Sequence, residues 1–237
     1  MFFTPLCKAY NLDVNMWNDF EGKIGNEDIQ LSIYLFENGQ IKGNYCYKKY
    51  ENKIQLTGQL TGNKIELTEF INDKPNGYFQ GKAFTNKYDS LCGYWTDISK
   101  TKHLDLKLSL KSMGGGSFEH RYSDFYGSDK EVENFVKHIK SSIMKNDKDW
   151  IANHVKYPLY TTLNNEKAIK IKNKQQLFDH FDQVFHKTFK EKIQTYCPCN
   201  LFHNYQGVML GNGEIWIYQK PNSNENKYDY YIISINN

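Results

Sequence analysis

The sequence of 237 residues predicts two domains, an all-β antiparallel barrel or meander followed by an α+β domain with helices packed on a curved antiparallel sheet. Three observations lead to this prediction. Runs with a period of two fill the first half of the chain, which is typical of half-buried strands. Three consecutive glycines, Gly114 to Gly116, then interrupt the chain. Helical periodicity begins only after these glycines. We therefore expect domains at 1–112 and 129–237, with 113–128 as a glycine-rich linker.

The first domain is predicted to contain eight short strands. Most runs alternate apolar and polar residues, and the run 103–110 does so throughout. Turn residues such as Glu37-Asn38-Gly39 separate the runs, so sequential strands are expected to be antiparallel neighbours. Glycines inside the runs favour the bends of a small closed barrel. The expected strands are 18–24, 29–36, 40–47, 53–60, 64–70, 77–84, 90–97 and 103–110.

Aromatic residues in these strands leave two interpretations of the barrel interior. Tyr45, Phe84, Tyr94 and Trp95 follow closely on the glycines. They either fill the barrel or line a pocket for a small apolar ligand, because an eight-stranded barrel is just wide enough for one ligand. The sequence leaves both open.

The second domain begins with a capping box. Ser128 and Glu131 have the S-x-x-E spacing that starts a helix. Asn146 or Asp147 is expected to cap a second helix, which ends at Tyr157-Pro158. Gly211-Asn212-Gly213 predicts a tight hairpin. Further expected elements are short strands at 159–163 and 168–171, one long helix at 174–190, and strands at 201–209, 214–218 and 228–235.

This order of elements resembles the nuclear-transport-factor-2-like family, which includes SnoaL-like and ketosteroid-isomerase-like proteins. The segments 129–144, 147–158, 174–190 and 206–217 carry the resemblance. The resemblance implies helices that close a bent sheet around a cone-shaped pocket. Members of the family include isomerases, hydratases, cyclases and many binding modules, so the fold does not give the function. It also implies a possible homodimer through the C-terminal sheet.

Candidate catalytic residues follow from the resemblance, which places an Asp, Tyr or His in the cone. They are His154, Tyr157 and Asp182, with His186, Tyr205 and Trp216 as further candidates. The H-E-x-x-H, G-x-S-x-G and P-loop patterns are absent from the sequence. We therefore expect no catalytic residues and no cofactor, and keep these candidates for an enzymatic alternative.

Cysteine spacing and charge restrict the possible ligands and partners. The five cysteines have irregular spacing, and Cys197-Pro198-Cys199 lacks the C-x2-C spacing of a zinc knuckle, so we expect no metal. The net charge of +3, from 30 basic and 27 acidic residues, is too balanced for a nucleic-acid partner. No run approaches the ~20 apolar residues of a membrane span. The N-terminus lacks the pattern of a secretory signal, which favours the cytoplasm; the alternative is a periplasmic or secreted protein whose signal peptide has been removed.

These observations favour a binding protein without catalysis. We sharpen this to a bacterial immunity or inhibitor protein that occludes a cognate protein toxin, because immunity proteins also occur in the family that the second half resembles. The alternatives are a small-molecule enzyme that uses the cone and a ligand carrier that uses the barrel. Loops rich in Tyr, Asn and Trp suit protein recognition. The expected binding residues are Tyr196, Asn200, Asn212, Trp216 and Asn222.

Overall fold

The structure is a computed structural model that describes residues 12–84, 90–222 and 227–237. It divides into two compact units, Met1–Glu119 and His120–Asn237. Cys7 and residues 223–226, which precede the expected strand 228–235, lie outside the described residues. Among the residues described, no helix combines the length and the apolar character needed to cross a membrane.

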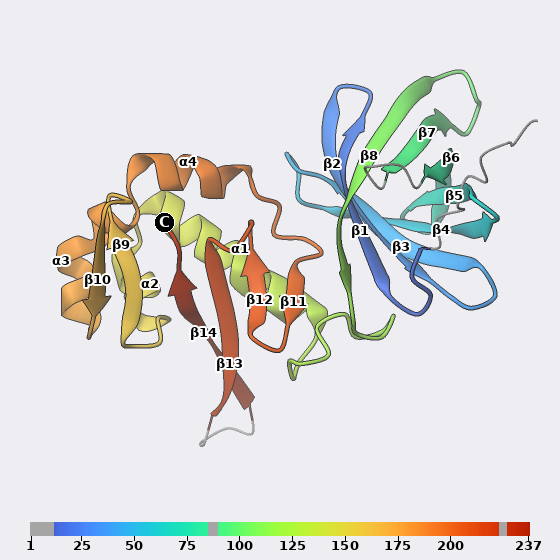
Figure 1. Ribbon diagram of the computed structural model, residues 1–237. Helices are drawn as coiled ribbons and strands as arrows, with labels where there is room; N and C mark the ends of the chain where they lie inside the picture. Colours follow the sequence, from blue (N-terminus) through green and yellow to red (C-terminus); the bar gives the residue numbers. More distant parts are fainter. Residues whose placement is uncertain (1–11, 85–89, 223–226) are drawn as a thin grey trace, which may run out of the picture. The chain divides into compact units, whose positions relative to one another are not determined.

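The first unit is a closed barrel of eight antiparallel strands in sequence order (Figure 1). All eight predicted strands are present. β1 closes the barrel by pairing with β8 as well as with β2. The strands are β1 Trp17–Ile24, β2 Glu27–Leu35, β3 Gln40–Tyr47, β4 Lys53–Thr61, β5 Lys64–Ile71, β6 Lys74–Phe84, β7 Ser90–Asp97 and β8 His103–Gly114.

β8 continues beyond its predicted end at Leu110 to Gly114. Met113 pairs with Asn18, and Gly114 pairs with Trp17. The backbone pairing of β1 with β8, which closes the barrel, thus holds Gly114 in a strand, although glycine loses more conformational entropy there than other residues do. The expected linker 113–128 therefore begins after Gly114, because its first two residues belong to β8.

Apolar side chains pack inside the barrel. Phe20, Leu31, Tyr45, Leu67 and Phe79 belong to one buried cluster that draws on several strands. This finding supports the interpretation in which aromatic residues contribute to the core. Tyr94 is instead exposed. The remaining members of the cluster are Leu12, Ile24, Ile29, Ile33, Leu35, Ile41, Leu56, Ile65, Ala83, Leu91, Leu106 and Leu108.

Two mid-strand glycines allow neighbouring strands to approach closely. A Cβ on Gly43 would lie 2.2 Å from the carbonyl oxygen of Ser32, and one on Gly58 would lie 1.9 Å from that of Glu66. Any side chain at either position would force these strands apart, which confirms a structural role for these glycines in the barrel.

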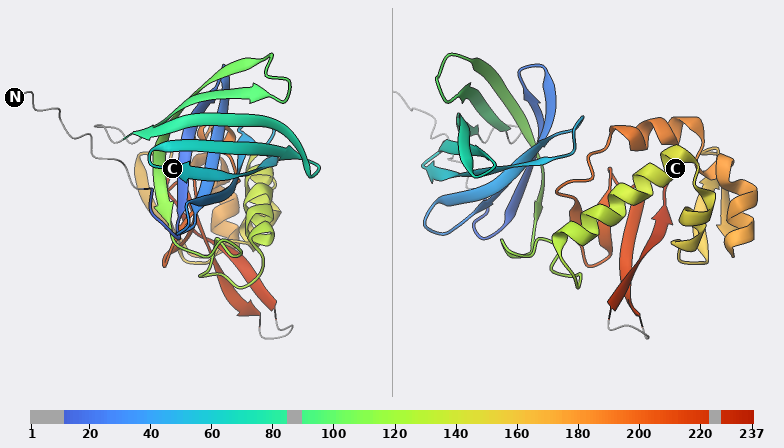
Figure 2. Two further views of the ribbon diagram at one scale, coloured as in Figure 1. Left: turned by 90° about the vertical axis from the view of Figure 1, so that its right-hand side faces the viewer. Right: turned by 180° about the vertical axis from the view of Figure 1, so that it is seen from behind.

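The second unit combines helices with two small sheets. α1, Asp129–Lys145, begins at the predicted capping box: the Ser128 side chain accepts from the backbone N–H of Glu131, whose side chain accepts from the backbone of Ser128. α1 lies across one face of a four-stranded sheet (Figure 2). After α1 the chain forms α2 Lys148–Asn153, β9 Leu159–Leu163 and β10 Lys167–Ile171, and two further helices follow before this sheet.

The predicted long helix at 174–190 is wrong, because the chain forms two helices there. α3, Lys174–Val184, ends at Phe185, and α4, Lys187–Thr195, begins at the cap His186. The backbone N–H of Asn164 donates to the carbonyl of Gln183 at 2.9 Å, and the amide of Asn237 donates to that of Val184 at 2.5 Å. These distant partners satisfy carbonyls that a continuous helix would use internally.

The predicted single strand at 201–209 is also wrong. It is a hairpin of β11, Phe202–Asn204, and β12, Gly207–Leu210. The side chain of Asn204 accepts from the backbone N–H of Gln206 at 2.9 Å, which forms the turn. The sheet has the order β11-β12-β13-β14, with β13 at Ile215–Asn222 and β14 at Lys227–Ile235. The predicted hairpin at Gly211–Gly213 joins β12 to β13.

Candidate functional site

A continuous series of ring contacts crosses the second unit. We call it the aromatic ladder and define it as Phe125, Tyr230, Phe135, Trp150, His138 and His154. Phe125 stacks on Tyr230 with a centroid separation of 6.2 Å, and Tyr230 stacks on Phe135 at 5.3 Å. Phe135 then contacts Trp150 at 5.5 Å. The ladder therefore joins the segment before α1 to β14, α1 and α2.

Trp150 lies between two imidazole rings. His138 stacks on it with a centroid separation of 4.2 Å and an interplanar angle of 7°. His154 stacks on it at 4.0 Å and 21°. Helical spacing accounts for this geometry, because residues three or four apart share one face of a helix: Phe135 with His138, and Trp150 with His154. The indole is held rigidly while remaining only partly buried.

A second aromatic pair adjoins the ladder. Tyr126 and Tyr228 stack with a centroid separation of 4.3 Å and an interplanar angle of 3°. The hydroxyl of Tyr230, a member of the ladder, donates to the carbonyl of Tyr126 at 3.3 Å. The Tyr126 side chain is 63% exposed. The pair therefore presents a flat, ordered aromatic surface to solvent next to the ladder.

A buried polar network fixes the segment that carries Phe125 and Tyr126. The hydroxyl of Tyr122 donates to Glu133 Oε1 at 2.9 Å and accepts from the backbone N–H of Leu201 at 2.9 Å. Glu133 Oε1 also accepts from the backbone N–H of Asn200 at 2.9 Å. Burial raises the pKa of Tyr122 well above its usual range, and the negative charge of Glu133 is the next largest cause. Tyr122 therefore remains a neutral donor in this network.

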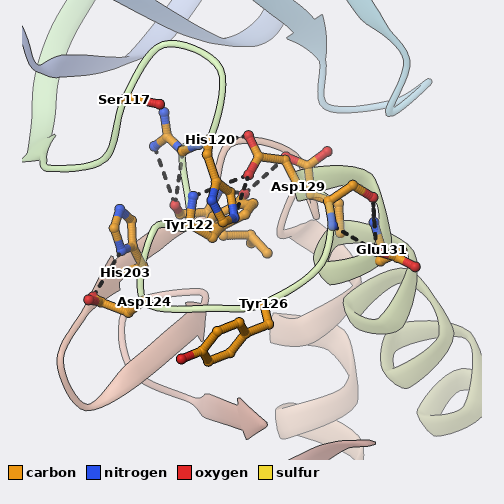
Figure 3. A network of polar contacts seen from close by, with 12 residues as sticks. Ser117, His120, Tyr122, Asp124, Tyr126, Asp129, Glu131 and His203 are labelled. Atoms are coloured by element: carbon orange, nitrogen blue, oxygen red, sulfur yellow. Dashed lines mark hydrogen bonds and ion pairs between the residues drawn. The ribbon is translucent and has the colours of Figure 1, made fainter. Parts of the chain in front are cut away.

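Asp129 anchors the same segment at the start of α1. Its two carboxylate oxygens accept from the backbone N–H groups of Arg121, at 2.9 Å, and Tyr122, at 3.2 Å (Figure 3). The guanidinium of Arg121 donates to the carbonyls of Asn200 and Leu201. The chain before α1 is thus tied both to the helix N-terminus and to the strand region near β11.

His203 and Asp124 form a further polar contact in this region. The Nδ1 atom of His203 on β11 lies 3.7 Å from Asp124 Oδ2, and the His203 side chain is nearly buried whereas Asp124 is half-exposed. The ring of His203 also meets that of Tyr122 edge-on at 5.7 Å. In Figure 3 the two side chains point toward each other, while Tyr126 lies apart from them.

Two of the five predicted binding residues lie close together. The backbone N–H of Asn212 donates to Glu214 Oε2 at 2.6 Å, and the side-chain amide of Asn212 reaches the hydroxyl of Tyr196 at 3.5 Å. Lys192 pairs with the same carboxylate. Burial by itself would raise the pKa of Glu214, but the hydrogen bonds from Lys192 and from the backbone lower it on balance. These groups brace the hairpin at Gly211–Gly213.

Of the other three predicted binding residues, Trp216 lies near the same hairpin, because a Cβ on Gly213 would lie 3.7 Å from its Nε1, whereas Asn200 and Asn222 lie elsewhere in the second unit. Asn200 is buried in the polar network around Glu133. Trp216 lies on β13 opposite Met209 and meets Phe202 edge-on. The side chain of Asn222, at the end of β13, donates to Asp229 at 3.2 Å. The structure therefore does not gather the five into one surface.

Each of the three candidate catalytic residues contacts a residue that is not itself a catalytic candidate. The ring of His154 stacks on Trp150 in the aromatic ladder. The hydroxyl of Tyr157 donates to the carbonyl of Ala152 at 3.1 Å, and burial raises the pKa of Tyr157 to about 12. Asp182 is exposed and pairs with Lys148 at 3.0 Å. Among the further candidates, His186 caps α4, and Tyr205 is 82% exposed in the turn between β11 and β12.

Sequence reasoning missed the aromatic ladder because its rings come from four separate segments of the chain. A partial signal was available: Phe135 and His138 share one face of a predicted helix, and so do Trp150 and His154. The stacking of Phe125 on Tyr230 left no such signal.

No family model matches the chain, and no curated protein or solved structure matches it either. The closed β-barrel is shown by the structure. The resemblance of the second unit to the nuclear-transport-factor-2-like family stays a prediction.

Proposed function

We propose that this chain is a non-catalytic binding protein whose second unit recognises a protein partner through the aromatic ladder and the adjoining pair Tyr126–Tyr228. We propose further that the partner is a toxin, which the chain neutralises by occlusion as an immunity protein does. The flat, exposed stack of Tyr126 on Tyr228 is the observation that carries the proposal.

Aromatic side chains suit protein recognition for two physical reasons. They bury a large area with few rotatable bonds, and Tyr and Trp combine an apolar ring with a polar group. Rings that are already stacked lose little further side-chain entropy on binding. Trp150, held between two imidazoles, and Tyr126, stacked on Tyr228, meet this condition.

The polar network adds a second line of support. Buried contacts of Tyr122 and Asp129 fix the segment directly before Phe125 and Tyr126. A recognition surface carried on a fixed segment is preorganised, and preorganisation lowers the free-energy cost of association. This arrangement favours recognition by a rigid surface over recognition by a loop that orders on binding.

Affinity capture with matched variants tests the proposal. The experiment incubates four tagged forms of the chain with lysate and with candidate toxins: the wild type, Tyr126→Ala, Trp150→Ala and the control Tyr160→Ala. Tyr160 is a suitable control because it is exposed to the same extent as Tyr126 but lies on β9, outside the ladder. We expect stoichiometric capture of one toxin by the wild type and by Tyr160→Ala.

We expect Tyr126→Ala and Trp150→Ala each to weaken binding of that toxin by about tenfold or more, as loss of an interface hot spot does. Equal affinity for all four proteins would refute the proposed surface. Binding without suppression of toxin activity would refute neutralisation while keeping recognition. Light scattering on the isolated chain tests the separate prediction of a homodimer through the C-terminal sheet.

A further inference from the structure

A buried carboxylate faces the interior of the barrel near one end. Glu69 on β5 is 1% exposed. It follows the core residues Ile65 and Leu67 at a spacing of two, and residues with this spacing share one face of a strand, so the Glu69 side chain lies on the inner face. The hydroxyl of Tyr45 donates to Glu69 Oε2 at 2.7 Å, and the indole N–H of Trp95 donates to the same oxygen at 2.9 Å. Inner side chains of the barrel therefore fix this oxygen.

The other oxygen of Glu69 has a different kind of partner. Glu69 Oε1 accepts from the side-chain amide of Asn76, which is exposed. Glu69 pairs with Gly77, and the next pair joins Phe70 to Pro75, so Asn76 is the extra residue of a β-bulge. Such bulges redirect a side chain and are common beside functional sites. The bulge here turns an exposed amide onto a buried carboxylate.

The residue after the bulge makes room for the indole. A Cβ on Gly77 would lie 2.5 Å from Trp95 Nε1 and 2.7 Å from the adjoining ring carbon. Only glycine therefore lets the indole rest against β6 where its N–H can reach Glu69. The bulge residue and this glycine are thus adjacent in sequence: Asn76 donates to Glu69, and Gly77 leaves room for the indole that donates to it.

The face of this indole also attracts a cation of the chain itself. The ammonium nitrogen of Lys102 lies 5.9 Å from the centroid of the Trp95 ring, within the range of a cation–π interaction. Lys102 is exposed, as Asn76 is. Two solvent-exposed side chains therefore contact this site: Asn76 supplies a neutral donor to Glu69 Oε1, and Lys102 supplies a cation near the ring whose N–H reaches Glu69 Oε2.

We propose that this end of the barrel binds a primary ammonium group, which displaces Asn76 from Glu69 Oε1 and takes the place of Lys102 beside Trp95. The ammonium comes either from a small free amine or from a lysine side chain of a protein. An N–H donor that carries charge forms a stronger hydrogen bond with a carboxylate than the neutral amide of Asn76 does. The inference concerns the first unit and does not depend on the aromatic ladder.

Titration of the full chain with defined amines tests this inference. The probes are butylamine, Nα-acetyl-lysine methylamide and the same lysine derivative acetylated on Nε. The readout is the NMR signal of the Trp95 indole N–H, assigned with Trp95→Phe. We expect both ammonium probes to shift this signal and the acetylated probe, which has no charge, to leave it in place.

Three variants sharpen the test. Asn76→Ala uncovers Glu69 Oε1, and Lys102→Ala removes the competing cation, so each should tighten amine binding by about threefold or more. Glu69→Gln should weaken it by about tenfold, since the charge of the acceptor is lost. If Glu69→Gln does not fold, the amine affinities of Asn76→Ala and Lys102→Ala still test the proposal.

An unmoved indole signal with both ammonium probes would overturn the proposal, and so would equal amine affinity in the wild type, Asn76→Ala and Lys102→Ala. A preference of about tenfold for the lysine derivative over butylamine would assign the site to a lysine of a protein partner. Equal affinity for the two would assign it to a free amine.

Discussion

The barrel buries Glu69 and the second unit buries Glu133, and the donors to these two carboxylates differ in kind. Glu133 in the second unit accepts from the Tyr122 hydroxyl and from a backbone N–H of Asn200, both buried. Glu69 in the barrel accepts from three side chains, one of which, Asn76, is exposed.

The kind of donor indicates a structural role for Glu133 and is consistent with the binding role proposed for Glu69. A backbone donor on a distant loop cannot turn away without moving that loop, so the donors of Glu133 hold two segments of the chain together. An exposed amide can turn into water at small cost, so a ligand can reach the oxygen of Glu69 that it covers. Burial alone did not distinguish these two carboxylates, but the identity of their donors does.

The largest expected effect is on the stability of the network around Glu133. Glu133→Ala leaves the Tyr122 hydroxyl and the Asn200 N–H without this acceptor, so we expect a loss of about 3 kcal/mol in the free energy of unfolding. Urea denaturation measures it. Glu66→Ala, at an exposed glutamate of β5, is the control and should change stability by less than about 0.5 kcal/mol. A similar result for both variants would contradict the structural role.

A smaller loss is expected for the matching change in the barrel. Glu69→Ala leaves the buried Tyr45 hydroxyl without this acceptor, but Trp95 is only partly buried and Asn76 can bond to water. We expect a loss of about 2 kcal/mol, measured in the same way. A loss larger than that of Glu133→Ala would reverse the comparison.

The third prediction concerns alkaline pH in the second unit. Burial raises the pKa of Tyr157 to about 12, above the value of about 10 in an unfolded chain. The stabilisation linked to this proton is therefore fully present below pH ~10 and is lost as the pH rises toward about 12. Tyr157→Phe should reduce the fall in urea midpoint over this interval. An unchanged slope would show that Tyr157 does not contribute.

The smallest effect on stability is expected at Asn76. Asn76→Ala removes one exposed hydrogen-bond donor, so the free energy of unfolding should change by about 0.5 kcal/mol or less. Its expected increase in amine affinity would then appear in a protein of nearly wild-type stability. A loss comparable to that of Glu69→Ala would make Asn76 a structural partner of the carboxylate, as the donors of Glu133 are.

Local patterns in the sequence predicted much of the fold. All eight barrel strands, the capping box at Ser128 and the hairpin at Gly211–Gly213 follow from periodicity and turn residues, which act over a few neighbouring residues. The break at His186 could not be predicted in this way. It depends on Asn164 and Asn237, whose donors reach the end of α3 from elsewhere in the chain.

The candidate sites were less predictable than the fold. The composition of two loops predicts Tyr196 and Asn212 as binding residues, and the structure brings these two together around Glu214. The same signal predicts Asn200, which is instead buried beside Glu133. Loop composition indicates exposure only on average, whereas the burial of a particular side chain depends on which distant segment packs over it.

Neighbours along the chain are sufficient to predict the eight antiparallel strands, the point after which helices begin and the start of α1. Three other features depend on the folded chain: β8 continues to Gly114 to close the barrel, rings from four segments stack in one ladder, and Tyr45 and Trp95 donate to the buried Glu69. Strand closure, ring stacking and these donors to a buried carboxylate join residues far apart in sequence, and no local pattern encodes their distance.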